Sequence, residues 1–158
     1  MAKRHRYAVT IRWTGNRGEG TATYRSYDRA HQIEANGKPA IAGSSDAAFR
    51  GDPARWSPED LFLASISACH KLWYLHLCAI SNIVVTSYVD GAEGTLEEEA
   101  GGEGQFTGVT LHPLVTISPE SDAGRAMELH HDAHEKCFIA RSVNFPVSVK
   151  AEIVTRTC

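Results

Sequence analysis

The chain has 158 residues, of which 42% are apolar and 22% are charged, and its formal net charge is -3. This length and composition suit one ordinary globular domain, so we predict a single domain over residues 1–158 whose core needs no disulfides. The four cysteines form no Cys-x-x-Cys pair, and the chain does not open with a basic start followed by an apolar run. These features argue against a secreted disulfide scaffold and predict a cytoplasmic protein with reduced thiols.

The distribution of charged and polar residues disfavours nucleic acids and membranes as partners. Residues 1–30 are rich in Lys and Arg, but they contain no nucleic-acid recognition motif and suit a solvated strand face better. The longest apolar segment is interrupted by His70, Lys71 and His76, which makes it too polar to span a bilayer. We therefore expect no nucleic-acid partner and no membrane partner.

The first third of the chain is predicted to form an antiparallel meander followed by a long loop. Residues 6–13 alternate between apolar and polar side chains, and residues 20–35 are rich in Thr, Tyr and Ile, as strands are. Residues 36–56 contain several Gly and Pro residues, which favour a loop. A loop of that length inside a compact domain is often functional.

A long helix is predicted next, and its start is strongly marked. Ser57 suits the N-cap and Pro58 the first helical position, while Glu59 and Asp60 suit the positive end of the helix dipole. We expect this helix to run to about residue 81. The later segments are predicted to be a strand over 83–88, a turn over 91–104, a strand over 106–117 that forms the other arm of a hairpin, a second helix over 118–140 and a closing strand over 146–155.

Successive residues of a helix point about 100° apart, and on this basis the first helix has apolar side chains in nearly every direction around its axis. A helix that is apolar all round is buried all round. A chain of this size has little material to surround such a helix, so we predict a homodimer in which a second copy completes the core. Cys78 follows Cys69 by nine residues and lies about 180° round the helix, so we predict that Cys78 is a packing residue.

The second helix places His130, His134 and Cys137 on one stripe, at positions i, i+4 and i+7. With Cys69 as a fourth ligand, these side chains could form a zinc site, since helical histidines four residues apart are a known metal geometry. Alternatively, His130, His131 and His134 line a partly exposed helix face. The compact spacings that make zinc motifs specific are missing, which favours the second interpretation.

Cys69 has a candidate redox partner in Cys137, which indicates thiol chemistry. An isolated cysteine in a buried helix is usually a packing residue, but the combination with Glu59 and Cys137 favours a redox function. His70 follows Cys69 directly and points about 100° away on the helix, so it is a poor choice as the base for this thiol.

Two segments of the chain resemble the OsmC and organic hydroperoxide resistance (Ohr) proteins. In the first, Pro58-Glu59 is followed, ten residues after the glutamate, by Cys69 in Ser-Ala-Cys; in the second, a later helix ends in Ala-His-Glu-Lys-Cys137. The resemblance extends to the order of elements along most of the chain. It implies an OsmC-like α+β fold, in which antiparallel sheets wrap the central helices of an intertwined homodimer.

The resemblance also implies the reduction of organic hydroperoxides, an antioxidant activity used in the response to oxidative stress. Cys69 as a thiolate would attack the distal peroxide oxygen and become a sulfenic acid, with which Cys137 would condense to a disulfide. A dithiol reductant of the lipoyl type would then restore both cysteines. No bound cofactor is implied.

A thiolate in an apolar site needs a neighbouring cation. In the family this cation is an Arg held by the glutamate that matches Glu59, and the chain offers Arg50 and Arg17, of which we favour Arg50. In one straight helix, Glu59 and Cys69 would lie roughly 15 Å apart along the axis. Either an Arg bridges part of that distance, or Glu59 serves the partner's Cys69.

The chain departs from the family's pattern at two positions, since His70 stands where a Phe is usual and Phe138 where a Pro is usual. A second class of function therefore stays open. In it, the protein is a non-catalytic redox sensor or binds a small apolar ligand in the dimer cleft. Cys158, at the C-terminus, is expected to be incidental.

Overall fold

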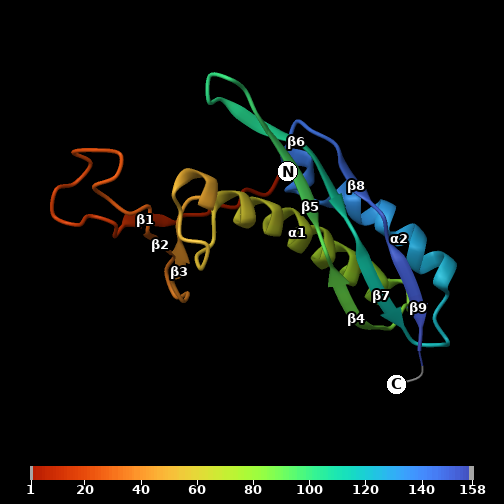
Figure 1. Ribbon diagram of the computed structural model, residues 1–158. Coiled ribbons are helices and arrows are strands. Elements are labelled where there is room, and N and C mark those ends of the chain that lie inside the picture. Colours follow the sequence, from red (N-terminus) through yellow and green to blue (C-terminus); the bar gives the residue numbers. More distant parts are fainter. Residues whose placement is uncertain (1, 157–158) are drawn as a thin grey trace. The chain divides into compact units, whose positions relative to one another are not determined.

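The computed structural model describes residues 2–156 and divides into two compact units, one up to Leu61 and one from Phe62 onward. Each unit has sheets of its own (Figure 1). The single domain over residues 1–158 stays a prediction, and the prediction for Cys158 lies outside the described residues. Within residues 2–156, no helix combines the length and the apolar character that crossing a membrane requires.

The first unit contains an antiparallel sheet of three strands in the order β1-β2-β3. Its elements are β1 (Thr10–Trp13), β2 (His31–Glu34), β3 (Ile41–Gly43) and a short 3-10 helix, η1 (Ala47–Phe49). Ile33 of β2 pairs with Ile11 on one side and with Ile41 on the other, so three isoleucines form a row across the sheet. Such cross-strand pairs stabilise the sheet and set its register. The predicted meander is confirmed.

The strands of this unit are shorter than the sequence pattern predicted. The first begins at Thr10 instead of residue 6, and only the last part of residues 20–35 is a strand. Turns occupy much of the segment between, where the side-chain oxygen of Asn16 accepts hydrogen bonds from the N–H groups of Gly18 and Gly20. The prediction of one loop over 36–56 is wrong, because this segment contains both β3 and η1.

An apolar row lies uncovered along β1 and the residues before it. Tyr7, Val9, Ile11 and Trp13 are 90%, 67%, 59% and 44% exposed. Within β1, Ile11 and Trp13 lie on the same face, since alternate residues of a strand do. A group of exposed apolar side chains of this kind is typical of a surface that contacts another protein.

Helix α1 (Pro58–Ile80) begins where the sequence predicted, and its N-terminus explains why. The Ser57 hydroxyl accepts a hydrogen bond from the Asp60 N–H at 3.1 Å, and an oxygen of the Asp60 carboxylate accepts one from the Ser57 N–H at 3.0 Å. This reciprocal capping box satisfies two backbone donors that the first turn leaves free. A cap of this type stabilises a helix by about 1 kcal/mol.

The second unit contains two sheets, in the orders β4-β7-β9 and β5-β6-β8. The strands are β4 (Val85–Asp90), β5 (Glu93–Glu98), β6 (Gly104–Leu111), β7 (Pro113–Ile117), β8 (Val147–Val149) and β9 (Glu152–Thr155). Antiparallel pairing joins β4 to β7 and β5 to β6, and parallel pairing adds β9 to β7 and β8 to β6. Figure 1 shows that β4 and β5 follow one another along one long ribbon, as do β6 with β7 and β8 with β9. The α+β class is confirmed, with sheets that are mixed instead of purely antiparallel.

The hairpin predicted between residues 83 and 117 is present, but its arms are longer and its turn is shorter. The turn prediction for 91–104 is wrong over Glu93–Glu98, which form β5. All six residues of β5 are exposed, so the strand carries no apolar alternation that the sequence could reveal. The closing strand predicted over 146–155 is divided between two sheets, as β8 and β9.

Helix α1 buries one stripe instead of its whole circumference. The residues of this stripe are Ile66, His70, Tyr74, Leu77 and Cys78. In contrast, Leu72 and Ile80 are 62% and 65% exposed. This agrees with the expectation that one chain cannot surround α1, because α2 and the strands cover only one side of it. Burial of the remaining side by a second copy stays a prediction.

The core of the second unit fixes α1 against α2 (Ala123–Lys136) and β7. Its larger cluster consists of Tyr74, Leu77, Cys78, Ile83, Val115, Ile117, Ala126, Leu129 and Ala133. A smaller cluster joins Ile66 of α1 to Val109 and Leu111 of β6. Each fully buried side chain of this size contributes roughly 1.5–3 kcal/mol. The position of α1 relative to α2 follows from this packing.

Helix α2 is shorter at both ends than the predicted 118–140. The Asp122 carboxylate caps its start by accepting a hydrogen bond from the Arg125 N–H at 3.0 Å. Ser121 lies before the helix, and its hydroxyl accepts a hydrogen bond from the Val84 N–H at 2.9 Å. Cys137 is the C-cap residue, and a short 3-10 helix, η2 (Ala140–Ser142), follows it.

Candidate redox site

Cys69 and Cys137 are brought together by the two helices of the second unit. Cys69 lies in the middle of α1, Cys137 lies at the C-cap of α2, and both thiols are free. Their side chains lie near one another. The sequence therefore predicted correctly which two cysteines meet.

The two thiols differ in their surroundings. Cys137 is fully buried, whereas Cys69 is only partly buried. Burial raises the pKa of the Cys137 thiol to about 11, and the neighbouring Cys69 acts in the same direction. The Ala140 N–H opposes this by donating a hydrogen bond to the Cys137 sulfur at 3.4 Å. At neutral pH Cys137 is therefore a protonated thiol.

This arrangement assigns different chemical abilities to the two sulfurs. Cys69 is the more exposed of the two, while Cys137 is closed to solvent and has Cys69 as a neighbour. Oxidation of one sulfur would place the other within reach for disulfide formation, because the reaction requires attack of one sulfur on its neighbour. The pair is thus a candidate redox site.

Cys78 takes no part in this pair, as predicted. It is 1% exposed and belongs to the larger core cluster, which also contains Tyr74. Burial raises the pKa of the Cys78 thiol, which keeps the thiol protonated and unreactive. Cys78 is a packing residue.

Glu59 lies in the first turn of α1, within the first unit. One of its carboxylate oxygens, Oε2, is buried and has no hydrogen-bond partner among residues 2–156. Burying a carboxylate oxygen without a hydrogen-bond donor costs folding free energy, so the Glu59 carboxylate is suited to a contact with a cationic side chain. The role of Glu59 at Cys69 stays a prediction.

Arg50 and Arg17 also belong to the first unit and differ in what they contact. Arg17 donates hydrogen bonds to the backbone oxygens of Arg25 and Ser26 and lies 3.8 Å from the Asp28 carboxylate. The guanidinium of Arg50 lies over the ring of Tyr24, 5.8 Å from its centre. Arg17 is thus held in its own loop, which leaves Arg50 the freer of the two predicted candidates.

A cavity of about 430 Å³ lies beside Arg50 in the first unit. It is lined by Asp28, Arg29, Ala30, Ser44, Arg50, Gly51, Asp52 and Arg55. Arg55 is not among the predicted site residues, and its Nη1 is buried without a hydrogen-bond partner among the described residues. Nothing in the sequence distinguishes Arg55 from an ordinary surface arginine, because its burial depends on the fold of the loop.

A pair of histidines lies close to the cysteine pair in sequence but is enclosed in the protein. His70 and His130 are 1% and 4% exposed, and His70 Nε2 shares a hydrogen bond with His130 Nδ1 at 3.0 Å. The ring of His130 also stacks on Tyr74, with ring centres 3.8 Å apart. The prediction that His130 lies on a partly exposed helix face is wrong. Its position on the same stripe as Leu129 and the buried alanines of α2 was the signal for burial.

Both enclosed histidines are neutral at physiological pH. Burial, reinforced by the charge of His134, lowers the pKa of His70 to about 4, although Asp90 opposes the shift. Burial and the neighbouring His70 lower the pKa of His130 to about 3. The Nε2 of His70 is hydrogen-bonded to His130, so this nitrogen is not free to act as a base for Cys69.

The zinc interpretation of the sequence finds no support in the geometry. Within residues 2–156, no group of three or more His, Cys, Asp and Glu side chains is placed to hold a metal ion. Cys69 and Cys137 are neighbours, and the Nδ1 of His130 is already hydrogen-bonded to His70.

Residues 51–152 match the family model described as OsmC-like protein. The chain belongs to the OsmC-like family. It is 33% identical over 97 residues to the organic hydroperoxide resistance protein OhrB of Bacillus subtilis, an alignment that covers 61% of this chain and 68% of OhrB. This confirms the family that the cysteine and glutamate motifs indicated.

Solved structures of OsmC-like proteins confirm the fold. An OsmC-like protein of unknown function from Vibrio cholerae matches with a TM-score of 0.85 at 32% identity, over 94% of this chain and 100% of the other. The structure of Bacillus subtilis OhrB matches with a TM-score of 0.59 at 25% identity, over 92% of this chain and 96% of the other. The OsmC-like chain described here is thus similar both to a named hydroperoxide resistance protein and to a relative without a known function.

Proposed function

We propose that this OsmC-like protein is a thiol peroxidase that reduces organic hydroperoxides. The observation that carries the proposal is the contact between a partly buried Cys69 and a fully buried Cys137. The similarity to OhrB, an organic hydroperoxide resistance protein, supports the class of substrate. The proposed cycle requires a compartment that keeps thiols reduced, as the cytoplasm does.

The proposed reaction has three steps that balance. The Cys69 thiolate attacks the distal oxygen of the hydroperoxide, the O–O bond breaks, and the alkoxide takes up a proton and leaves as the alcohol. Cys69 is then a sulfenic acid, which the Cys137 thiol attacks to form a disulfide and release water. A dithiol of the lipoyl type donates two electrons and two protons, restores both thiols and leaves as its own disulfide.

Arg50 is proposed to stabilise the Cys69 thiolate, with Glu59 orienting its guanidinium. The buried, unpartnered Oε2 of Glu59 supports this role, because a guanidinium is the donor that best satisfies a buried carboxylate. Replacing Arg50 by Gln should slow the oxidation of Cys69 by about tenfold or more, since a cation favours the thiolate form. Arg17→Gln is the matched control, and an equal effect of both changes would argue against the choice of Arg50.

A homodimer is proposed as the functional form. The exposed apolar row from Tyr7 to Trp13 and the exposed Leu72 and Ile80 of α1 are the surfaces that a second copy would cover. Ile11→Asp should shift the protein from dimer to monomer in sedimentation velocity experiments, whereas Thr10→Asp, on the other face of β1, should not. An active monomer would exclude the hypothesis that Glu59 serves the partner's Cys69.

The experiment that tests the proposed function is the rate of disulfide formation between Cys69 and Cys137. Reduced protein is mixed with cumene hydroperoxide or with hydrogen peroxide, and the disulfide is followed by mass spectrometry. We expect fast formation with a strong preference for the organic peroxide, and recycling by dihydrolipoamide. Slow oxidation without a preference would contradict the peroxidase, and oxidation without recycling by dithiols would favour the redox sensor.

A further inference from the structure

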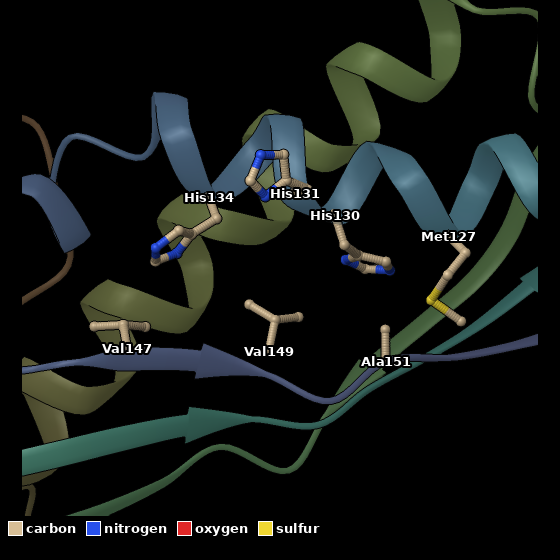
Figure 2. Close-up of a pocket in the computed structure, with 7 residues that line it drawn as sticks. All are labelled: Met127, His130, His131, His134, Val147, Val149 and Ala151. Atoms are coloured by element: carbon tan, nitrogen blue, oxygen red, sulfur yellow. The ribbon is translucent and has the colours of Figure 1, made fainter.

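A cavity of about 300 Å³ lies between α2 and the strand segment that runs from β8 towards β9. Its lining consists of Met127, His130, His131, His134, Val147, Val149 and Ala151. Figure 2 shows His130, His134 and Met127 extending from α2 toward the strand that carries Val147, Val149 and Ala151. The last three alternate along the chain and therefore share one face of the strand. The volume equals that of about ten water molecules at roughly 30 Å³ each.

The helix side of this cavity carries polar atoms that the protein itself does not satisfy. His130 is 4% exposed, and its Nε2 is buried without a hydrogen-bond partner among residues 2–156. The Nδ1 of His134 is also buried and unpartnered within the described chain. Buried polar atoms are normally hydrogen-bonded, and exceptions in native proteins mark a bound molecule or a functional site. Both histidines line the cavity, so their unpartnered nitrogens mark this wall as a candidate ligand site.

The hydrogen bond between His70 and His130 lets the free nitrogen of His130 adapt to its ligand. When His130 Nδ1 donates to His70 Nε2, His130 Nε2 is an acceptor; when His70 Nε2 donates, His130 Nε2 carries the proton and is a donor. Both forms are neutral. The cavity can therefore match either a hydroxyl or a carbonyl group.

The charge of the lining selects against ionic ligands. No Lys, Arg, Asp or Glu is among the residues that line the cavity. Burial keeps His130 in its neutral form, since it lowers the pKa of this side chain to about 3. No Lys or Arg is present to pair with a bound anion, and burying an unpaired charge is very costly. A neutral ligand fits this lining better.

We propose that this cavity binds a small neutral molecule with one hydroxyl or carbonyl group and a compact apolar body. The polar group hydrogen-bonds with His130 Nε2 and His134 Nδ1, and the apolar body packs on Val147, Val149 and Met127. The site is separate from the cysteine pair, and its existence does not depend on peroxidase activity.

The test compares three probes of similar shape: benzyl alcohol, toluene and benzoate. Each is titrated into the full-length protein, labelled with ¹⁵N in its histidine rings and ¹³C in its valine methyl groups, and followed by NMR. We expect benzyl alcohol to shift the His130 Nε2 signal and the methyl signals of Val147 and Val149 in a saturable way. It should bind at least about tenfold more tightly than toluene, because a site built for hydrogen bonding rejects an analogue without the polar group.

A pair of variants distinguishes this site from adventitious apolar binding. His134→Leu removes both ring nitrogens, including the unpartnered Nδ1, and should weaken benzyl alcohol binding, with little effect on toluene. His76→Leu, on the exposed side of α1, is the matched control and should leave binding unchanged. Equal affinity for toluene and benzyl alcohol, tighter binding of benzoate, the absence of any saturable shift, or an unaffected His134→Leu variant would each overturn the proposal.

Discussion

The same two helices bring together two pairs of reactive side chains with opposite properties. Cys69 and Cys137 form a pair in which one member is partly exposed, whereas His70 and His130 are 1% and 4% exposed. Cys69 and His70 are neighbours in sequence, but consecutive residues of a helix point about 100° apart. One step along α1 therefore separates a thiol that solutes can reach from an imidazole that they cannot. Accessibility, and not residue type alone, therefore distinguishes the two pairs.

The largest expected effect separates the two sulfurs of the cysteine pair. Cys69→Ser should lower peroxide turnover by at least about 1,000-fold, because the attacking sulfur is lost. Cys137→Ser should also stop turnover but leave Cys69 as a sulfenic acid, which dimedone labels and mass spectrometry detects. Cys78→Ser is the control for a buried thiol and should keep the rate of disulfide formation. Dimedone labelling of Cys137 in the Cys69→Ser variant would reverse the assigned roles.

The second prediction concerns the histidine pair and acid. The folded-state pKa values of His70 and His130, about 4 and about 3, lie below the ordinary 6.5, so the folded state binds fewer protons than the unfolded state. The stability that these groups contribute is complete above pH 6.5 and is lost as the pH falls toward 4. Each histidine should lower the free energy of unfolding by about 1.4 kcal/mol per pH unit in this window.

Urea unfolding at several pH values measures this loss. The variant His70→Leu is the comparison, since removal of one titrating member should make the pH dependence shallower by about one proton. An unchanged slope in this variant would show that other groups cause the acid sensitivity. Histidine NMR titration gives an independent check, because neither ring should take up a proton between pH 7 and pH 5.

The third prediction measures how much the histidine bond stabilises the fold. His70→Leu leaves the Nδ1 of His130 buried without its partner at 3.0 Å. The free energy of unfolding at pH 7 should fall by about 1–3 kcal/mol, the usual cost of a buried polar group that loses its hydrogen bond. His76→Leu, at an exposed position of α1, should change it by less than about 0.5 kcal/mol. A stability equal to that of the parent protein would mean that the pair contributes nothing.

The smallest expected effect is that of replacing Tyr74, whose ring stacks on the histidine pair at His130. Its hydroxyl donates a hydrogen bond to the Ala126 oxygen at 3.1 Å, while its ring stacks on His130. Tyr74→Phe keeps the stacking and removes the bond, so it should cost about 1 kcal/mol in urea unfolding at pH 7. Tyr24→Phe, at a side chain that is 61% exposed in the first unit, is the control and should have no measurable effect. A loss of disulfide formation in Tyr74→Phe would show that the two pairs are coupled.

Much of the local structure could be predicted from the sequence. The start of α1 was predictable because Ser57 and Asp60 cap one another through bonds between near neighbours in the chain. The cysteine pair was predictable because Glu59, Cys69 and Cys137 form a motif with a specific spacing. In both cases the information lies within short segments or in residue types with few roles.

Strand β5 and the histidine pair could not be predicted in the same way. The residues of β5 are exposed on both faces, so no alternation reveals the strand, and its pairing with β6 alone makes it one. His130 lies on a stripe whose burial depends on α1 packing against α2 through Tyr74 and Leu129. A polar side chain becomes a core residue only when a partner satisfies it, and that partner is 60 residues away.

The sequence by itself determined the family, the capped start of α1 and the identity of the two cysteines that meet. Local hydrogen bonds and residue spacing are sufficient for those features. The tertiary structure alone decided that Cys69 is partly exposed while His70 is buried, and that two histidines with unpartnered buried nitrogens line one cavity. These features depend on which side of each helix the sheet covers, and burial is a property of the assembled core, which no short segment contains.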